Sequence, residues 1–192
     1  SDENFEIVLG EGYSGRVSVN IAKIPHMLIG GSTGSGKSVL LKLVLTQCVK
    51  KDAKVYIADF KGGVDFPPIW HTKCSLLTDE KTLHKVLVSI TDELQNRKQI
   101  LRTAGVANID EYNRNAEKKL YRIVFACDEI AEVLDKTGLS KQQKDEILKI
   151  ESELSIIARQ GRAFGIHLVL ATQRPDAAIL NGQIRNNIDT RI

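Results

Sequence analysis

The chain has 192 residues, a formal net charge of +3, 42% hydrophobic residues and 27% charged residues. This length suits a single domain with a sizeable core, and the composition is ordinary for a globular protein. The composition excludes a low-complexity chain. No apolar run approaches the length of about 20 residues that a membrane-spanning helix needs. The mild positive charge permits a nucleic-acid partner without requiring one.

The first part of the chain favours a β-hairpin. Residues 5–9 and 16–21 alternate between apolar and polar side chains, as strands with one buried face do. A glycine-rich turn at residues 10–15 joins them. We expect residues 1–25 to form this hairpin. We expect residues 26–192 to form the core domain, truncated at its C-terminal end as a fragment of a longer protein.

Four short, almost wholly apolar runs follow the hairpin, and helical segments separate them. Such runs are typical of strands that are buried on both faces of a parallel sheet. The alternation of strands and helices predicts βαβ units with right-handed crossovers, and hence an α/β fold with a mostly parallel central sheet flanked by helices. The four expected strands are His26–Ile29, Val55–Ala58, Ile123–Cys127 and Ile166–Ala171.

The helices between these strands are expected to be amphipathic. Apolar residues recur at helical spacing over residues 83–101, and Gly105 is placed to end that helix. Asn108 is a suitable N-cap for a short helix through Ala116. A second amphipathic helix is predicted over residues 140–160, where isoleucine and leucine side chains share one face.

Residues Gly31–Ser38 match the pattern G-x-x-x-x-G-K-[ST] of a phosphate-binding loop. The apolar run 26–29 precedes them and the helix-forming run 39–50 follows, which is the strand–loop–helix setting that such a loop needs. At average residue usage, the four fixed positions match by chance on the order of one time in a hundred in a chain of this size. We therefore interpret the segment as a nucleotide-binding loop and not as an accidental glycine-rich turn.

The chemistry of this loop assigns roles to its residues. Glycine lets the backbone turn its N–H groups inward, and these groups form a nest for anionic oxygens with the helix N-terminus. Lys37 is expected to reach the β- and γ-phosphates of ATP, and the Ser38 hydroxyl is expected to bind Mg²⁺. The predicted nucleotide-binding residues are Ser32, Thr33, Gly34, Ser35, Gly36, Lys37, Ser38 and Val39.

The acidic pair Asp128 and Glu129 follows the third buried run. A carboxylate at the end of a buried strand can bind Mg²⁺ through its water shell, which suits Asp128. Glu129 can polarise the attacking water as a general base. Taken locally, an acidic pair that caps a helix over residues 130–134 fits as well. The phosphate-binding loop about 90 residues upstream decides in favour of catalysis.

Polar residues at other strand ends are further candidates, because ligands of α/β sheets bind at the carboxyl edge. Gln173 is interpreted as a residue that senses the γ-phosphate or positions water, in preference to a plain loop residue. Asp59 either contacts the metal's water shell or caps its own loop. Arg159 and Arg162 are candidates for an arginine finger across a subunit interface, although spacing alone favours surface arginines at a helix C-terminus. No histidine or cysteine is assigned a catalytic role.

These motifs resemble those of the motor domain of FtsK/SpoIIIE-type translocases, which are RecA-like P-loop ATPases. The resemblance extends from the region of Gly10 to the last residue, and its last motif, Ala171–Pro175, is strongly characteristic of the family. The other segments that carry it are Ile24–Ile29, Thr33–Ser38, Gly105–Asn113 and Gly161–His167.

The resemblance implies a homo-hexameric ring that binds ATP and Mg²⁺ between neighbouring subunits and threads double-stranded DNA through its channel. It implies that Arg162 is the arginine finger and that Gln173 is the sensor. It also implies that Arg174 and Arg185 contact DNA phosphates near the pore, although Arg185 also fits a solvated helix charge. The domain is expected to be cytoplasmic, with its parent protein at the cytoplasmic face of the membrane.

One departure from the family leaves the substrate open. Phe60–Gly63, after the second strand, resembles the type VII secretion ATPases, which move proteins. The first hypothesis is a DNA motor that serves conjugation, which we prefer, or chromosome segregation. The alternative is an ATPase that exports a secreted protein. A degenerate nucleotide-binding module that serves only as an assembly platform is disfavoured by the intact Lys37, Ser38 and acidic pair.

Overall fold

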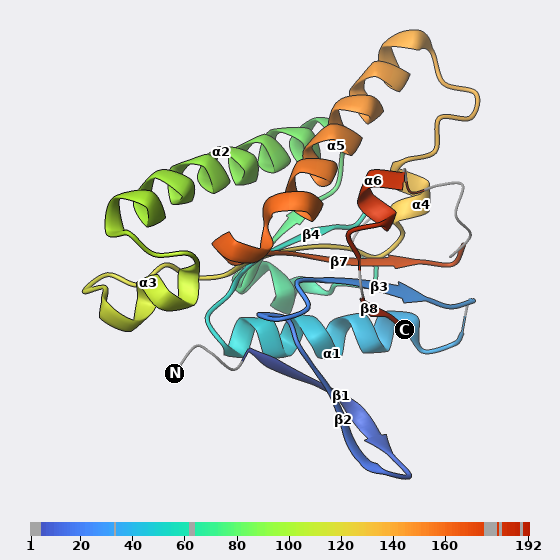
Figure 1. The fold of residues 1–192 in the computed structure, drawn as a ribbon. Coiled ribbons are helices and arrows are strands. Elements are labelled where there is room, and N and C mark those ends of the chain that lie inside the picture. Colours follow the sequence, from blue (N-terminus) through green and yellow to red (C-terminus); the bar gives the residue numbers. More distant parts are fainter. Residues whose placement is uncertain (1–4, 33, 62–63, 175–179, 181, 189) are drawn as a thin grey trace.

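The computed structural model contains a six-stranded parallel sheet and a two-stranded antiparallel hairpin (Figure 1). It describes residues 5–32, 34–61, 64–174, 180, 182–188 and 190–192. The strands of the large sheet are β3 (His26–Gly30), β4 (Lys54–Ala58), β5 (Cys74–Leu77), β6 (Ile123–Cys127), β7 (Ile166–Thr172) and β8 (Thr190–Arg191). They lie in the order β5-β4-β6-β7-β3-β8, and every neighbouring pair is parallel. The predicted α/β fold with a parallel central sheet is confirmed.

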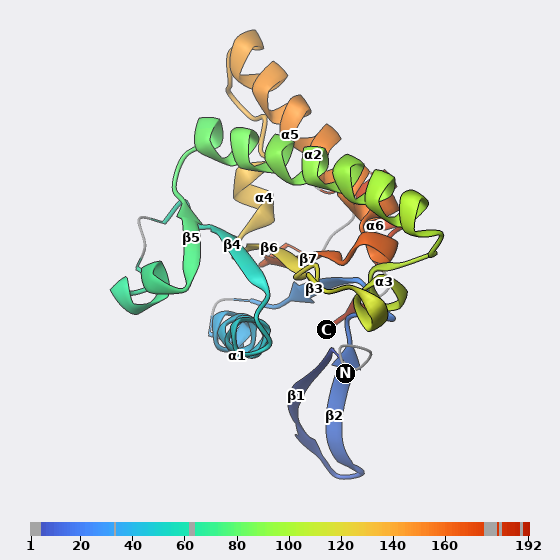
Figure 2. The same cartoon turned by 90° about the vertical axis from the view of Figure 1, so that its left-hand side faces the viewer.

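Helices cover both faces of this sheet. Helix α1 (Lys37–Lys50) lies on one face, and α2 (Glu80–Ala104) and α5 (Lys141–Gln160) lie on the other, as the three layers in Figure 2 show. The shorter elements are α3 (Ile109–Asn115), α4 (Ile130–Val133), α6 (Gly182–Arg185) and the 3-10 turns η1 (Pro68–Thr72) and η2 (Arg162–Phe164). None of the described helices is long and apolar enough to cross a membrane.

Side chains of the central strands alternate between two hydrophobic cores, because successive residues of a strand point to opposite faces. On β6, Phe125 packs in the core shared with α2 and α5, whereas Val124 packs in the core shared with α1. On β3, Leu28 packs in the core shared with α2 and α5, and Met27 packs in the core shared with α1. Burial on both faces explains why these strands read as continuous apolar runs.

The ends of the long helices follow from local sequence signals. Gly105 ends α2 in the left-handed conformation, with a φ of 67°. Asn108 caps α3 by accepting a hydrogen bond from the Glu111 N–H at 2.9 Å. At the start of α5, Ser140 and Gln143 form a reciprocal capping box. The helix boundaries predicted at these residues are confirmed.

The hairpin consists of β1 (Glu6–Gly12) and β2 (Gly15–Asn20). It is attached to α1 through Gln47, whose side-chain amide donates to the Val8 carbonyl at 2.8 Å and accepts from the Val8 N–H at 2.9 Å. Ile7 is fully buried in the core that α1 shares with the sheet. The predicted hairpin is therefore present, and its base belongs to the core on the α1 face.

Two strands at the edges of the sheet, β5 and β8, were not expected from the sequence. β5 has four residues and pairs with β4, whereas β8 has two residues and pairs with β3. Runs this short carry no hydrophobic period that could distinguish a strand from a loop. Their extended backbone is set by hydrogen bonding to the neighbouring strand, which is a property of the folded sheet.

A buried histidine lies near the amino-terminal edge of the sheet. His167 on β7 is 0% exposed. Its Nδ1 atom lies 3.1 Å from the Pro25 carbonyl oxygen, and its Nε2 atom lies 3.2 Å from Nη1 of Arg122. A neutral ring that donates from Nδ1 and accepts at Nε2 satisfies both contacts. Burial and, to a smaller extent, the charge of Arg122 lower the pKa of His167 well below its usual value.

The free energy of unfolding is therefore expected to fall as the pH falls below about 6.5, the pKa of an exposed histidine. The unfolded chain binds a proton that the folded chain excludes, so this site gives a slope approaching about 1.4 kcal/mol per pH unit. Urea denaturation at a series of pH values on either side of neutrality measures the slope. His167→Gln should reduce it, and His71→Gln, at an exposed histidine, should not. Equal slopes in His167→Gln and the wild type would contradict this assignment.

Candidate nucleotide-binding site

The loop between β3 and α1 has the backbone of a phosphate-binding loop. Gly34 and Gly36 have φ angles of 81° and 91°, in the left-handed region that glycine adopts without strain. Gly36 is the N-cap of α1, no side chain of the described residues caps this helix, and its first turn contains no acidic residue. The N–H groups at such a helix N-terminus attract anions. The loop therefore presents its amides and the positive end of a 14-residue helix to a phosphate.

Gly31, the first residue of the loop, packs closely against Ser35. A Cβ atom at Gly31 would collide with Oγ of Ser35, so a larger residue there would require the Ser35 side chain to rotate away. The Ser35 N–H donates to the Ser32 carbonyl at 3.1 Å, which closes a turn. Val39 is exposed in the first turn of α1. Thr33, which was also predicted to bind the nucleotide, lies outside the described residues.

Lys37 connects this loop to the end of β6. Its side chain is buried, and its Nζ atom donates to the Asp128 carbonyl oxygen at 2.6 Å. The same atom lies 3.4 Å from Oε2 of Glu129 and 3.8 Å from Oδ1 of Asp128. An ammonium group with three donors is thus held between the loop and the acidic pair, where a phosphate bound to the loop would meet it.

Ser38 and Asp128 form the second link between the loop and β6. The Ser38 hydroxyl lies 3.3 Å from Oδ1 of Asp128, and Lys61 lies 3.3 Å from Oδ2 of the same carboxylate. One hydroxyl and one carboxylate suit Mg²⁺, which takes oxygen ligands and completes its shell with water and phosphate. The described residues hold no group of three or more His, Cys, Asp or Glu side chains that could bind a metal unaided. A magnesium ion that shares its ligands with a nucleotide fits this site.

Asp59 lies at the end of β4, beside the same site. One carboxylate oxygen, Oδ1, accepts a hydrogen bond from the Lys61 N–H at 3.0 Å, so Asp59 does cap its own loop. The other oxygen, Oδ2, is buried and has no hydrogen-bond partner among the residues that the structure describes. Asp59 and Asp128 also line one small cavity. A buried carboxylate oxygen without a donor is a suitable acceptor for a metal-bound water, so the two functions considered for Asp59 are compatible.

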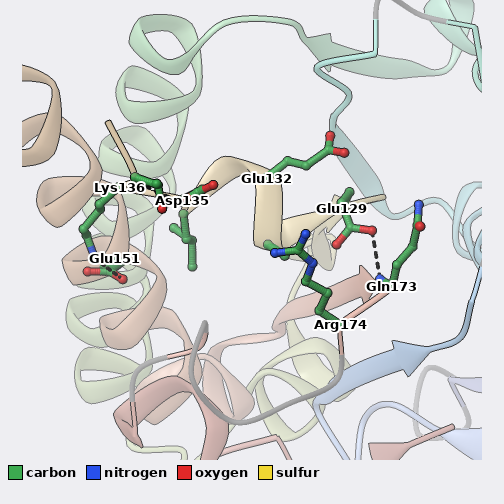
Figure 3. Close-up of a pocket in the computed structure, with 10 residues that line it drawn as sticks. Glu129, Glu132, Asp135, Lys136, Glu151, Gln173 and Arg174 are labelled. Carbon is green, nitrogen blue, oxygen red and sulfur yellow. Dashed lines mark hydrogen bonds and ion pairs between the residues drawn. The ribbon is translucent and has the colours of Figure 1, made fainter. Parts of the chain in front are cut away.

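Glu129 is held by the end of β7. Its Oε1 atom accepts from the Thr172 hydroxyl at 2.7 Å. Its Oε2 atom accepts from the Gln173 N–H at 2.8 Å, the contact dashed in Figure 3. Glu129 occupies the N-cap position of α4, but its side chain makes no capping hydrogen bond. The helix-capping alternative is therefore not supported by the contacts, which place the carboxylate next to Lys37.

Gln173 and Arg174 lie beside a cavity of about 630 Å³ between the end of β7 and α4. Both side chains are exposed. Figure 3 shows the Arg174 side chain extending from the end of β7 toward α4. The cavity wall also contains Glu132 and Asp135, and hydrogen bonds from Thr137, with a smaller contribution from Arg174, lower the pKa of Asp135. Arg174 is thus close to acidic side chains of its own chain.

The remaining predicted residues lie away from the loop. Arg162 is exposed in η2, directly before β7 and therefore at the opposite edge of the sheet from the loop. Arg185 is partly buried at the end of α6. The structure thus brings Lys37, Ser38 and the acidic pair together with the end of β7, but it does not bring Arg162 to the same site within one chain.

Two contacting residues received no role in the sequence-based interpretation. Lys61 lies against Asp128, and Thr172 lies against Glu129. Thr172 lies in the Ala171–Pro175 motif that carries the family resemblance, whereas Lys61 lies in the Phe60–Gly63 segment that departs from the family. These two segments are the sequence signals that could have indicated the two residues. Their partners are 67 and 43 residues away in the chain, so no local pattern links them.

The order of the strands completes the description of the site. β7 lies between β3, which leads into the phosphate-binding loop, and β6, which ends at the acidic pair. One carboxyl edge of this parallel sheet carries a phosphate-binding loop, a buried lysine and a strand that ends in acidic residues. This arrangement defines a P-loop ATPase fold of the RecA-like type.

The chain belongs to the FtsK/SpoIIIE family, whose family model matches residues 1–177. It is 32% identical over 203 residues to the DNA translocase FtsK of Chlorobaculum tepidum, covering 97% of this chain and 24% of that protein. It is 33% identical over 217 residues to the FtsK of Shewanella oneidensis, covering 100% of this chain and 24% of that protein. The chain therefore spans about a quarter of the length of these relatives.

Solved structures agree with this assignment. The pCW3 conjugation coupling protein TcpA, in its monomer form with ATPγS, is 38% identical with a TM-score of 0.94, over 100% of this chain and 54% of that chain. The cytoplasmic domain of EssC is 24% identical with a TM-score of 0.79, over 97% of this chain and 36% of that chain. The second likeness concerns the fold alone.

Proposed function

We propose that this chain is the ATP-hydrolysing motor domain of a protein that translocates double-stranded DNA through a homo-hexameric ring. The observation that carries the proposal is the meeting of Lys37 and Ser38 with Asp128 and Glu129 at one edge of the sheet. The FtsK relatives support DNA as the substrate. The 38% identity to a conjugation coupling protein favours DNA transfer by conjugation over chromosome segregation.

Hydrolysis follows from the roles of these residues. The loop amides and Lys37 bind the β- and γ-phosphates. Ser38 and Asp128 would hold Mg²⁺, which would supply positive charge to neutralise the phosphates. Water attacks the γ-phosphorus while the bond to the bridging oxygen breaks, and Glu129 accepts the proton of that water. The products are ADP and phosphate. Gln173, next to Glu129, senses the γ-phosphate.

Arg162 requires a second subunit in this proposal. Because it lies before β7, at the far edge from its own loop, it acts on the nucleotide of a neighbouring subunit as an arginine finger. ATP is then bound between subunits of the ring. An arginine at this position would stabilise the charge on the transferring phosphoryl group only after the ring has assembled.

Arg174 and Arg185 are proposed to contact DNA. Both lie in the segment after β7, and their guanidinium groups would bind phosphates, giving affinity without sequence preference. Arg174 would have to leave its acidic neighbours for a phosphate. The domain would work in the cytoplasm, with the parent protein at the cytoplasmic face of the membrane.

A protein substrate is the alternative. The loop that begins at Phe60 and Lys61 favours it through its likeness to type VII secretion ATPases. The Thermomonospora curvata type VII secretion ATPase EccC is 22% identical to this chain, so its likeness concerns the fold alone. DNA is therefore the preferred substrate.

Double-stranded DNA is expected to stimulate ATP hydrolysis by the full-length parent protein several-fold. The stimulation should weaken steeply between about 50 and 200 mM salt, because phosphate contacts release counterions. Phosphate release with DNA, with a secreted peptide and with neither measures it. A rate that rises with the peptide and not with DNA would favour export and overturn the DNA proposal.

A further inference from the structure

Thr172, the last residue of β7, lies between the two halves of the candidate site. It is 2% exposed. Its carbonyl oxygen accepts from the N–H of Gly31, the first residue of the phosphate-binding loop, at 3.2 Å. Its hydroxyl group is 2.7 Å from Oε1 of Glu129. The backbone of this one residue therefore holds the start of the loop, while its side chain contacts the proposed base.

The direction of the hydroxyl hydrogen bonds can be assigned from their lengths. A hydroxyl has one proton to donate. The Glu129 carboxylate at 2.7 Å is a closer and more strongly charged acceptor than the Arg174 carbonyl at 3.3 Å. The hydroxyl also accepts from the Arg174 N–H at 3.0 Å. Thr172 thus donates to Glu129 and is itself oriented by the backbone that follows β7.

The hydrogen bonds to Glu129 restrict its carboxylate in complementary ways. The Gln173 N–H and, at 3.4 Å, the Lys37 ammonium group both reach Oε2, but contacts to this one oxygen leave the carboxylate group free to rotate about it. The Thr172 hydroxyl fixes Oε1, so the plane of the carboxylate is defined. A glutamate side chain otherwise has several rotatable bonds, and holding a catalytic group in one orientation in advance increases the rate of the step that it assists.

We infer that Thr172 is a positioning residue for ATP hydrolysis, whose hydroxyl orients the Glu129 carboxylate for accepting the proton of the attacking water. This inference rests on the proposed role of Glu129 as the base. Thr172 acts through Glu129, and its hydroxyl donates no hydrogen bond to the described residues of the phosphate-binding loop. Its loss should therefore slow the chemical step and leave nucleotide binding intact.

Thr172→Val in the full-length parent protein tests this, because valine keeps the shape of threonine and removes the hydroxyl. The kcat of ATP hydrolysis is expected to fall about tenfold or more, as for the loss of one hydrogen bond to a charged group. The KM for ATP and the affinity for a fluorescent ATP analogue should stay within about twofold. Thr172→Ser, which restores the hydroxyl, should recover most of the lost kcat.

A matched control exists elsewhere in the chain. Thr91 on α2 is 8% exposed and donates to Oε2 of Glu153, also at 2.7 Å. Thr91→Val removes the same kind of bond away from the site, so its kcat should equal that of the wild type. If Thr172→Val does not fold, Thr172→Ala and Thr172→Ser give the same comparison, since they differ only by a hydroxyl.

Several results would overturn the inference. These are an unchanged or higher kcat in Thr172→Val, a loss of activity in Thr172→Ser equal to that in Thr172→Val, and a raised KM at unchanged kcat. Each of them leaves the proposed function standing if the wild type hydrolyses ATP. A wild-type protein that binds ATP with DNA present and does not hydrolyse it would overturn the proposed function and this inference together.

Discussion

Replacing Lys37 with alanine is expected to abolish ATP hydrolysis by the parent protein and to reduce the affinity for ATP by about 100-fold or more, as for the loss of one partner of a buried, hydrogen-bonded charge pair. Lys37 is the cation held between the loop and the acidic pair, 3.4 Å from Glu129 and 3.8 Å from the Asp128 carboxylate. Without it, the phosphates would face two buried carboxylates with no lysine between them. Titration with a fluorescent ATP analogue and measurement of phosphate release test both expectations.

Controls for Lys37 must distinguish lost function from lost folding. Removing one partner of a buried ion pair destabilises a protein by about 3 to 5 kcal/mol, so Lys37→Ala should also lower the melting temperature. Lys37→Met keeps the apolar stem of the side chain and should be equally inactive. Lys50→Ala, at the exposed end of the same helix, should retain full activity. Wild-type turnover in a folded Lys37→Met protein would contradict the role of the lysine.

The central strands could be predicted because each is buried on both faces. β3, β4, β6 and β7 are continuous apolar runs bounded by polar or glycine residues, and their boundaries agree with the structure to within one residue. The edge strands β5 and β8 are too short to show a pattern. Their pairing depends on a neighbouring strand that is distant in sequence, so local residues do not determine it.

The candidate site could be predicted in part for a related reason. The carboxyl ends of parallel strands meet at one edge, so the proximity of the loop to Asp128 and Glu129 follows from the strand pattern alone. The contact between Thr172 and Glu129 does not follow from the strand pattern, because it requires β7 to lie beside β6. The acidic surroundings of Arg174 depend in the same way on α4 packing near the end of β7.

Glu129→Gln is expected to stop turnover while ATP binding is retained. Glutamine has the shape of glutamate, but its amide cannot accept the proton of the attacking water, so kcat should fall by about 100- to 10,000-fold. Glu129 also lies 3.4 Å from Lys37, where its negative charge competes with phosphate for the ammonium group. Removing that charge should leave the Kd for ATP unchanged or lower it.

The matched control for this change is Glu132→Gln. Glu132 lies one helical turn further along, in α4, and is exposed beside the same cavity, but no hydrogen bond joins it to β7 within the described residues. It should therefore keep wild-type kcat. A fluorescent ATP analogue gives the Kd, and release of phosphate gives kcat. If Glu129→Gln kept its turnover, another carboxylate would have to activate the water. Asp59, with a buried oxygen that has no donor within the described part of the chain, would then be the residue to replace next.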